Sequence, residues 1–231
     1  MKVQNIIGIC KCCGKRIQTA VISDDVDYTK YTLETYKAYK NIQVEKCPEC
    51  NFVCDNLFIG NIPSDVKNII NSDDYQYVLN YEYIEEEVPR EVWDYEIQAF
   101  NPNDYEAYAI VCDVVGEYEN EIRALYKCIT LKEKTIRHLR KIQYEECDDC
   151  DWSPEYNKII EALEESIEIN LDEICELITE IKNPNRFTEM IMIEVYSKME
   201  EYKKAKNAYK TLKSQIQLPQ DLDDYLKTIL N

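Results

Sequence analysis

The chain has 231 residues and a formal net charge of −18, from 27 basic and 45 acidic side chains. It is long enough for one large domain, or for a small domain followed by a larger one, each with a buried core. Four glycines and 31% charged residues are typical of long helices with few tight turns. No apolar run approaches the ~20 residues that cross a bilayer, which argues against a membrane protein.

The charge is divided unevenly along the chain. Residues 1–50 contain eight basic and six acidic groups, so they carry +2 and residues 51–231 carry −20. An acidic bulk repels phosphate, which argues against nucleic-acid binding by most of the molecule. Only the N-terminal segment has the cations for such contacts, namely Lys2, Lys11, Lys15, Arg16, Lys30, Lys37 and Lys40.

The N-terminal segment begins with an apolar run at 3–9 and a second at 17–22, and both are expected strands. They surround a cysteine-rich turn and are expected to pair as a hairpin. A helix is expected over 27–39, and a third strand over 41–46 leads into a second cysteine pair. We therefore predict a small α+β module over residues 1–60.

Two Cys-x-x-Cys pairs organise this module. Cys10 and Cys13 form the first and Cys47 and Cys50 the second, with residues 14–46 between them. Four thiolates in a tetrahedron suit Zn²⁺, and a closed set of four ligands leaves no position for a substrate. The spacing predicts a structural zinc site in a zinc-ribbon-like fold.

The residues after each pair support this turn. Gly14 and Asn51 directly follow the second cysteine, and both residue types tolerate the left-handed conformation in which such a turn ends. Cys12 is an alternative ligand to Cys10 or Cys13, although only the latter two reproduce the spacing of the second pair.

Other roles for the cysteines remain open from the sequence. The N-terminus is too short and too polar for a secretory signal, so a cytoplasmic location is expected and disulfides are not. An iron–sulfur cluster also uses four cysteines. A third pair, Cys147 and Cys150, lies in an acidic stretch and is interpreted as ordinary thiols, with a redox pair as the alternative.

The rest of the chain has the pattern of a helical body. An apolar cluster at 52–59 is expected to dock the module on it, and 84–90 is a candidate linker. Helices are expected at 63–70, 74–83, 90–100, 101–116, 119–144, 154–168, 170–182, 186–199, 202–214 and 221–230.

Two stretches of this body match a degenerate tetratricopeptide pattern. In that pattern two helices meet at a small residue with large residues around it. Ala109 and Ala205 take the small positions, whereas Glu121 and Ile193 stand where small residues are expected. The large residues of the pattern are Tyr105, Tyr108, Tyr118, Leu125, Tyr196, Tyr202, Tyr209 and Leu212. We predict a mainly α fold, with a tetratricopeptide-like repeat domain over 61–231. The tyrosines are expected to pack between helices with their hydroxyls at the surface.

The order of these features resembles an uncharacterised bacterial family of zinc-knuckle proteins with paired Cys-Pro-x-Cys-Gly motifs followed by tetratricopeptide-like helices. The matching residues are Cys10, Cys13, Gly14, Asp27, Tyr28, Cys47, Pro48, Cys50 and Phe52. The chain departs from the pattern at Lys11 and Asn51, neither of which is a ligand. The resemblance implies the architecture and no known activity.

No glycine-rich phosphate loop, nucleophile elbow or His-Glu-x-x-His motif is present, so we expect no enzyme. The expected function is a cytosolic zinc-stabilised helical scaffold that binds a basic or amphipathic protein or peptide. The alternative is a nucleic-acid-associated zinc ribbon with an acidic helical body. The oligomeric state does not follow from the sequence.

Overall fold

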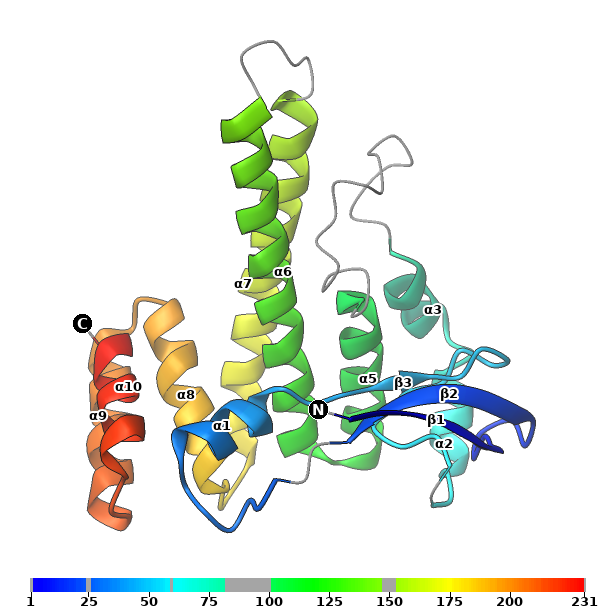
Figure 1. Cartoon of the computed structure of the whole chain (residues 1–231), viewed down its shortest axis with the longest axis horizontal. Coiled ribbons are helices and arrows are strands. Elements are labelled where there is room, and N and C mark those ends of the chain that lie inside the picture. The colour runs from blue at the N-terminus through cyan, green and yellow to red at the C-terminus, as the bar shows by residue number, and fades with distance from the viewer. Residues whose placement is uncertain (1, 24–25, 59, 82–100, 147–152, 231) are drawn as a thin grey trace.

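The structure is a computed structural model that describes residues 2–23, 26–58, 60–81, 101–146 and 153–230. It is mainly α, as predicted: two small two-stranded sheets lie in the N-terminal part, and helices make up the rest (Figure 1). No helix in the described ranges is long and apolar enough to span a membrane.

The first sheet is the predicted hairpin. Strands β1 (Lys2–Ile9) and β2 (Arg16–Ser23) are antiparallel, and Ile9 pairs with Arg16 beside the cysteine turn. The ring of Phe58 lies against β1 at Gly8, where an added Cβ would come within 2.3 Å of it. Glycine at this position therefore lets the hairpin contact the segment that follows the second cysteine pair.

The segment between the cysteine pairs differs from the prediction. Helix α1 spans Leu33–Lys40 instead of 27–39. Asp27 accepts hydrogen bonds from the backbone and hydroxyl of Thr29, which holds a turn, and Thr32 caps the helix that starts afterwards. The predicted strand over 41–46 is also reduced to β3 (Glu45–Lys46), because only these residues have a partner.

That partner, β4 (Val53–Cys54), was expected only as part of an apolar cluster. The cluster docks on the helical body as predicted: Phe52, Val53 and Leu57 are buried, and β4 contacts a helix of the body. The contacted helix is α5 (Pro102–Val115).

The helical body has eight helices within the described residues. Their bounds are α2 (Ser64–Ile69), α3 (Asp73–Asn80), α5 (Pro102–Val115), α6 (Tyr118–Glu146), α7 (Ser153–Glu180), α8 (Arg186–Lys198), α9 (Tyr202–Gln215) and α10 (Gln220–Ile229). The predicted linker at 84–90 and helix at 90–100 lie outside the described residues.

The α5–α6 corner follows its predicted signals. Asn101 accepts a hydrogen bond from the backbone N–H of Asn103 and caps α5. Gly116 ends it with φ +72°, and the next N–H, of Glu117, donates to the oxygen of Cys112 at 2.9 Å. This is the left-handed helix end that glycine stabilises.

Helix α7 is one continuous helix, whereas two helices meeting near residue 169 were predicted. Asn170 lies at the expected break, and asparagine is a poor residue inside a helix. Its side chain is buried and donates to Glu106 of α5 at 3.1 Å. A partner on a neighbouring helix therefore satisfies the amide, and the helix continues.

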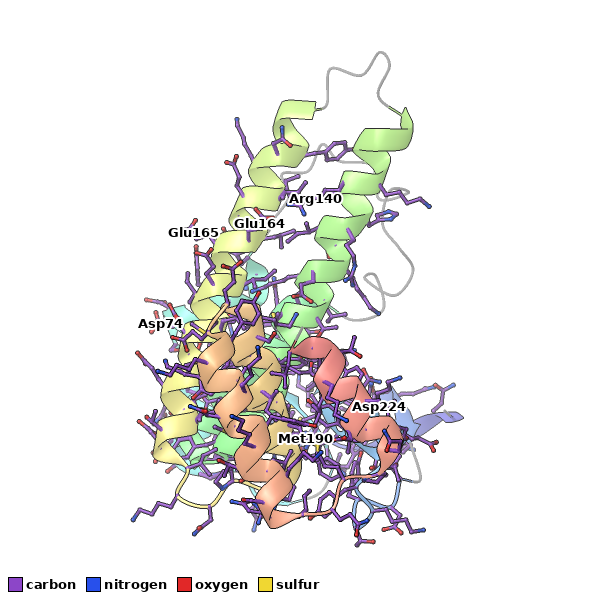
Figure 2. The ribbon with its side chains drawn as sticks, turned by 90° about the vertical axis from the view of Figure 1, so that its left-hand side faces the viewer. Asp74, Arg140, Glu164, Glu165, Met190 and Asp224 are labelled. Atoms are coloured by element: carbon purple, nitrogen blue, oxygen red, sulfur yellow. The ribbon has the colours of Figure 1, made fainter. Side chains whose placement is uncertain are left out.

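The long helices α6 and α7 pack side by side (Figure 1). Their halves near the 146–153 connection are held by a separate small apolar cluster, which includes Leu139 and Leu163. On its outside Arg140 of α6 pairs with Glu164 of α7 at 2.5 Å (Figure 2).

A single larger core joins the cysteine module to the helical body. Helix α1 contacts α6, α8 and α10, so a segment that lies between the cysteine pairs in sequence packs on the C-terminal helices. Ala109 and Ala205 are buried where helices α5 and α6, and α8 and α9, pack. The repeat assignment and the boundary near residue 60 stay predictions.

Candidate functional site

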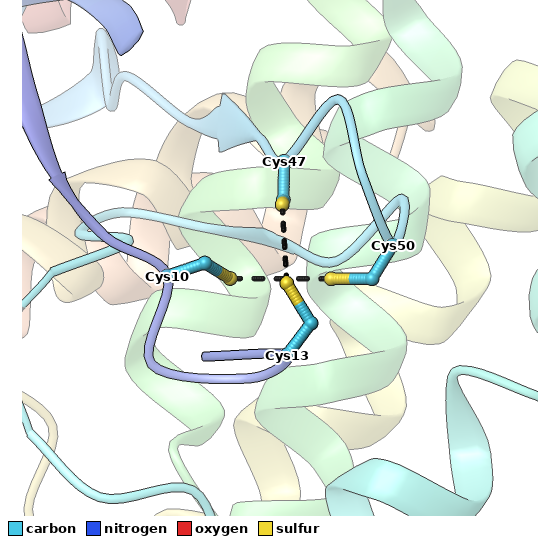
Figure 3. Close-up of side chains that lie close together, drawn as sticks. All are labelled: Cys10, Cys13, Cys47 and Cys50. Atoms are coloured by element: carbon cyan, nitrogen blue, oxygen red, sulfur yellow. Dashed lines mark hydrogen bonds between the residues drawn. The ribbon is translucent and has the colours of Figure 1, made fainter. Parts of the chain in front are cut away.

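The structure brings the four predicted cysteines together (Figure 3). Cys10 and Cys13 lie on the turn between β1 and β2, and Cys47 and Cys50 on the turn between β3 and β4. Their sulfur atoms all lie within 4.8 Å of one another. The Cys10–Cys50 and Cys13–Cys47 sulfur distances are both 3.9 Å.

These distances fit a tetrahedral metal ion. A zinc–sulfur bond of about 2.3 Å in a regular tetrahedron requires sulfur atoms about 3.8 Å apart. Within the described residues this is the single cluster with metal-ligand geometry. The four thiols can hold a metal ion, and as a complete set they fill its coordination sphere.

The two turns have the same backbone construction. The N–H of Gly14 donates to the oxygen of Cys10 at 2.9 Å, and the N–H of Asn51 donates to the oxygen of Cys47 at 2.9 Å. Both donors have positive φ, +73° and +59°. The backbone N–H of Cys12 also donates to the Cys10 sulfur at 3.4 Å. The predicted roles of the residues after each pair are confirmed.

The thiols differ in their electrostatics. Burial raises the pKa of Cys47 and of Cys50. Burial also acts to raise the pKa of Cys13, but the hydrogen bonds from Lys15 and the neighbouring sulfurs lower it overall. Four sulfurs at this separation repel one another when ionised, so a cation is required to hold all four as thiolates.

The remaining cysteines lie elsewhere. Cys12, the alternative ligand, is outside the group of four, and burial raises its pKa. Cys54 is buried, which raises its pKa to about 12 and leaves it an inert core thiol. Cys147 and Cys150 lie outside the described residues.

Tyr75 of α3 joins the second cysteine turn to the helical body through hydrogen bonds. Its hydroxyl accepts from the N–H of Val53 at 3.0 Å and donates to the oxygen of Asn51 at 3.0 Å. This phenol is buried, and burial raises its pKa, so it stays protonated. One side chain therefore holds the segment that leads from the turn into β4.

A second polar centre lies in the helical body, and nothing in the sequence predicted it. Glu194 of α8 is 5% exposed. Its carboxylate accepts from the hydroxyls of Tyr36 at 2.7 Å and Tyr225 at 3.0 Å, and from that of Tyr126. Lys40 of α1 pairs with it at 2.6 Å. We call these five residues the Glu194 cluster.

The tyrosines of the Glu194 cluster also surround the lysine. The ammonium group of Lys40 lies 4.5 Å from the ring centre of Tyr36, 5.2 Å from that of Tyr225 and 5.4 Å from that of Tyr126. Burial raises the pKa of Tyr36 far above its usual range, and the Glu194 charge adds to this. The expectation that tyrosine hydroxyls lie at the surface is wrong for these residues, because the buried carboxylate needs donors.

An acidic, partly apolar groove lies between α3 and α7. It has a volume of about 300 Å³ and is lined by Tyr77, Tyr81, Ile169 and Glu165, among others. Tyr77 is 65% and Ile169 59% exposed. Exposed acidic residues continue along α7 at Glu161, Glu168 and Asp172. Figure 2 shows Glu165 on the outer side of α7.

No family model, curated protein or solved structure matches the chain. Its function is therefore argued from the site and the surface.

Proposed function

We propose that this protein is a zinc-stabilised helical scaffold that binds a basic, amphipathic segment of another protein and catalyses no reaction. The observation that carries the proposal is the groove between α3 and α7. It combines exposed large apolar side chains with an acidic helix, which is the complement of a helix with one apolar and one basic face.

The apolar contribution comes from side chains that ordinarily avoid water. Tyr77 and Ile169 are among the most exposed large apolar residues in the described part of the chain, and both line this one groove. Such paired exposure marks interaction sites more often than scattered single residues do. We infer that a partner's apolar face covers them.

The electrostatic contribution comes from α7. This helix contains nine acidic residues and one basic residue, Lys158. Its stripe of exposed carboxylates runs beside the groove, at Glu161, Glu165, Glu168 and Asp172. Complementary charges accelerate encounter and select against acidic partners. A basic segment is therefore the occupant we propose.

The cysteine centre supports the scaffold. We propose Zn²⁺ at Cys10, Cys13, Cys47 and Cys50, because a closed set of four thiolates suits this ion. With no open coordination position, such an ion is structural. Thiolates of this kind persist in a reducing compartment, so we propose the cytosol.

The alternative, nucleic-acid binding by residues 1–50, needs a continuous basic face there. Lys15 pairs with Glu49 at 2.7 Å, and Lys40 with Glu194 at 2.6 Å. Two of the required cations are thus already compensated, and we prefer the protein ligand. Filter binding that retains no DNA or RNA would eliminate the alternative.

The test uses a helical peptide of leucine and lysine with all lysines on one face. We expect it to bind the protein in fluorescence anisotropy, and we expect Tyr77→Ser with Ile169→Ser to weaken binding about tenfold. Glu165→Gln with Glu168→Gln should weaken it mainly at low salt.

The matched control is Tyr202→Ser, because Tyr202 is 45% exposed on another helix, α9. It should bind the peptide like wild type. Equal binding by all variants would mean non-specific attraction to an acidic protein and would contradict the groove as the site.

A further inference from the structure

The strongest feature outside the cysteine site and the groove is a cavity of about 600 Å³ where α1, α6, α8 and α10 meet. The four helices contact one another, and α1 is labelled in the lower part of Figure 1. The Glu194 cluster forms part of its wall through Lys40, Tyr126, Glu194 and Tyr225. Part of the cavity wall is thus made of hydrogen-bonded side chains that are buried or half-buried.

The charge of this cavity is opposite to that of the molecule. Six cations line it and only two carboxylates, Glu133 and Glu194, so its formal charge is +4 in a chain of −18. The cations are Lys37, Lys40, Lys127, Lys134, Arg137 and Lys198. A gathering of like charges in an otherwise acidic protein focuses a positive potential that attracts anions.

The cations repel one another in the structure. Burial lowers the pKa of Lys40, and the charges of Lys198 and Lys37 lower it further against the pull of Glu194. An anion between these groups would relieve that repulsion. Lys37 of α1 and Arg137 of α6 are exposed at the cavity, and among the described residues neither is in an ion pair.

The size and donors of the cavity indicate the ligand. Its volume falls within the ~300–1,000 Å³ of small-molecule sites. Lysines recognise phosphate as point charges, and Asn41, Thr130 and Ser197 add neutral hydrogen-bonding groups. The charge of +4 matches a chain of phosphates better than a single carboxylate.

We propose that this cavity binds a small polyanion with several linked phosphate groups, such as a triphosphate, either free or carried by a nucleoside. The site lies on helices that the acidic groove does not use, so the scaffold would have a basic ligand pocket in addition to its acidic docking surface. The binding step is non-covalent.

The experiment is isothermal titration of the full-length, metal-loaded protein with inorganic triphosphate and, separately, with ATP. We expect micromolar binding of triphosphate that weakens as salt rises. Tighter binding of ATP would show that the site also contacts the nucleoside, and equal binding would show that it reads the phosphates alone. Metal content is measured after each titration, because triphosphate chelates divalent cations.

The test variant is Lys37→Gln with Arg137→Gln, which removes two exposed charges without touching the Glu194 cluster. We expect it to weaken triphosphate binding about tenfold or more. The control is Lys206→Gln with Lys210→Gln, which removes the same charge from exposed positions of α9. It should bind within about twofold of wild type.

Three results would overturn the proposal. The first is no binding at millimolar triphosphate. The second is an equal loss of affinity in the test and control variants, which would show that binding depends on the net charge of the protein and not on this cavity. The third is a short single-stranded oligothymidylate that binds the same site more than about tenfold more tightly than triphosphate, which would make the ligand a nucleic acid.

Discussion

The cysteine centre and the Glu194 cluster are two polar centres that hold the same chain in different ways. The first joins two turns whose ligands lie within a few residues of each other, from Cys10 to Cys13 and from Cys47 to Cys50. The second gathers side chains from α1, α6, α8 and α10 around one carboxylate. Local spacing therefore reveals the first centre, whereas only the fold reveals the second.

The residues of the two centres are interleaved along the sequence. Helix α1 lies between the two cysteine pairs, yet Tyr36 and Lys40 attach it to Glu194. A metal ion bound by the four cysteines would therefore stabilise the hairpin and the turns, whereas the Glu194 cluster holds α1 on the helical body.

The largest effect is expected from loss of the metal. A structural zinc contributes on the order of 10 kcal/mol to the folding of small metal modules. After chelation, or in Cys47→Ser, hydrogen exchange should show lost protection over 2–23 and 45–58. Protection of α1 should persist, because its contacts are to α6, α8 and α10. Loss of α1 together with the hairpin would contradict the separation.

Glu194→Ala should cost about 3–5 kcal/mol, because it leaves Lys40 without its charge partner and three tyrosine hydroxyls without an acceptor. Lys40→Met should cost less, since the hydroxyls still donate to Glu194. Urea unfolding measures both, with the exposed Glu161→Ala on α7 as control. An effect of Glu194→Ala no larger than the control would show that the cluster contributes no stability.

A smaller effect concerns pH. Glu121 is 3% exposed, and burial together with the charges of Asp113, Glu173 and Glu180 raises its pKa to about 8. Between pH 4.5 and 8 the folded state holds this proton and the unfolded state does not, so stability falls as pH rises.

Glu121→Gln should remove that part of the pH dependence. The melting temperature of this variant should equal that of wild type near pH 4.5 and should be roughly 5 °C higher near pH 8. If the melting temperatures of the two proteins changed equally with pH across this range, Glu121 would not be the source of the pH dependence. Glu161→Gln serves as the exposed control.

The smallest effect is expected at the ion pair beside the cysteine centre. Lys15 and Glu49 join the two turns at 2.7 Å, but their side chains are 61% and 44% exposed, against 14% and 6% for Lys40 and Glu194. Water and salt screen the exposed pair. Lys15→Gln should therefore leave the melting temperature unchanged within error, and a shift comparable to that of Lys40→Met would reverse this ranking.

Much of the fold follows from local rules in the sequence. Gly14 and Asn51 indicated left-handed residues, and Gly116 indicated the end of a helix; all three have positive φ. These signals succeed because a backbone conformation is a property of one residue and its neighbours. The cysteine group was found for the same reason, since its ligands come in short-range pairs.

Two of the failures have the opposite cause. A helix break was expected near residue 169, but Asn170 has its partner on α5. Surface hydroxyls were expected for the tyrosines, but the acceptor of Tyr36, Tyr126 and Tyr225 is on α8. Long-range partners decide these two cases, and one sequence does not display them. The late start of α1 is instead a local effect, because Asp27 and Thr29 hold a turn and Thr32 caps the helix that follows.

Elemental analysis of the purified protein tests whether the four cysteines form a closed metal centre. Cys47→Ser is the test variant and Cys12→Ser the matched control, because Cys12 neighbours the site but lies outside the group of four. We expect about one zinc per chain in wild type and in Cys12→Ser, and none retained in Cys47→Ser. A metal-free wild type, or equal loss in both variants, would contradict it.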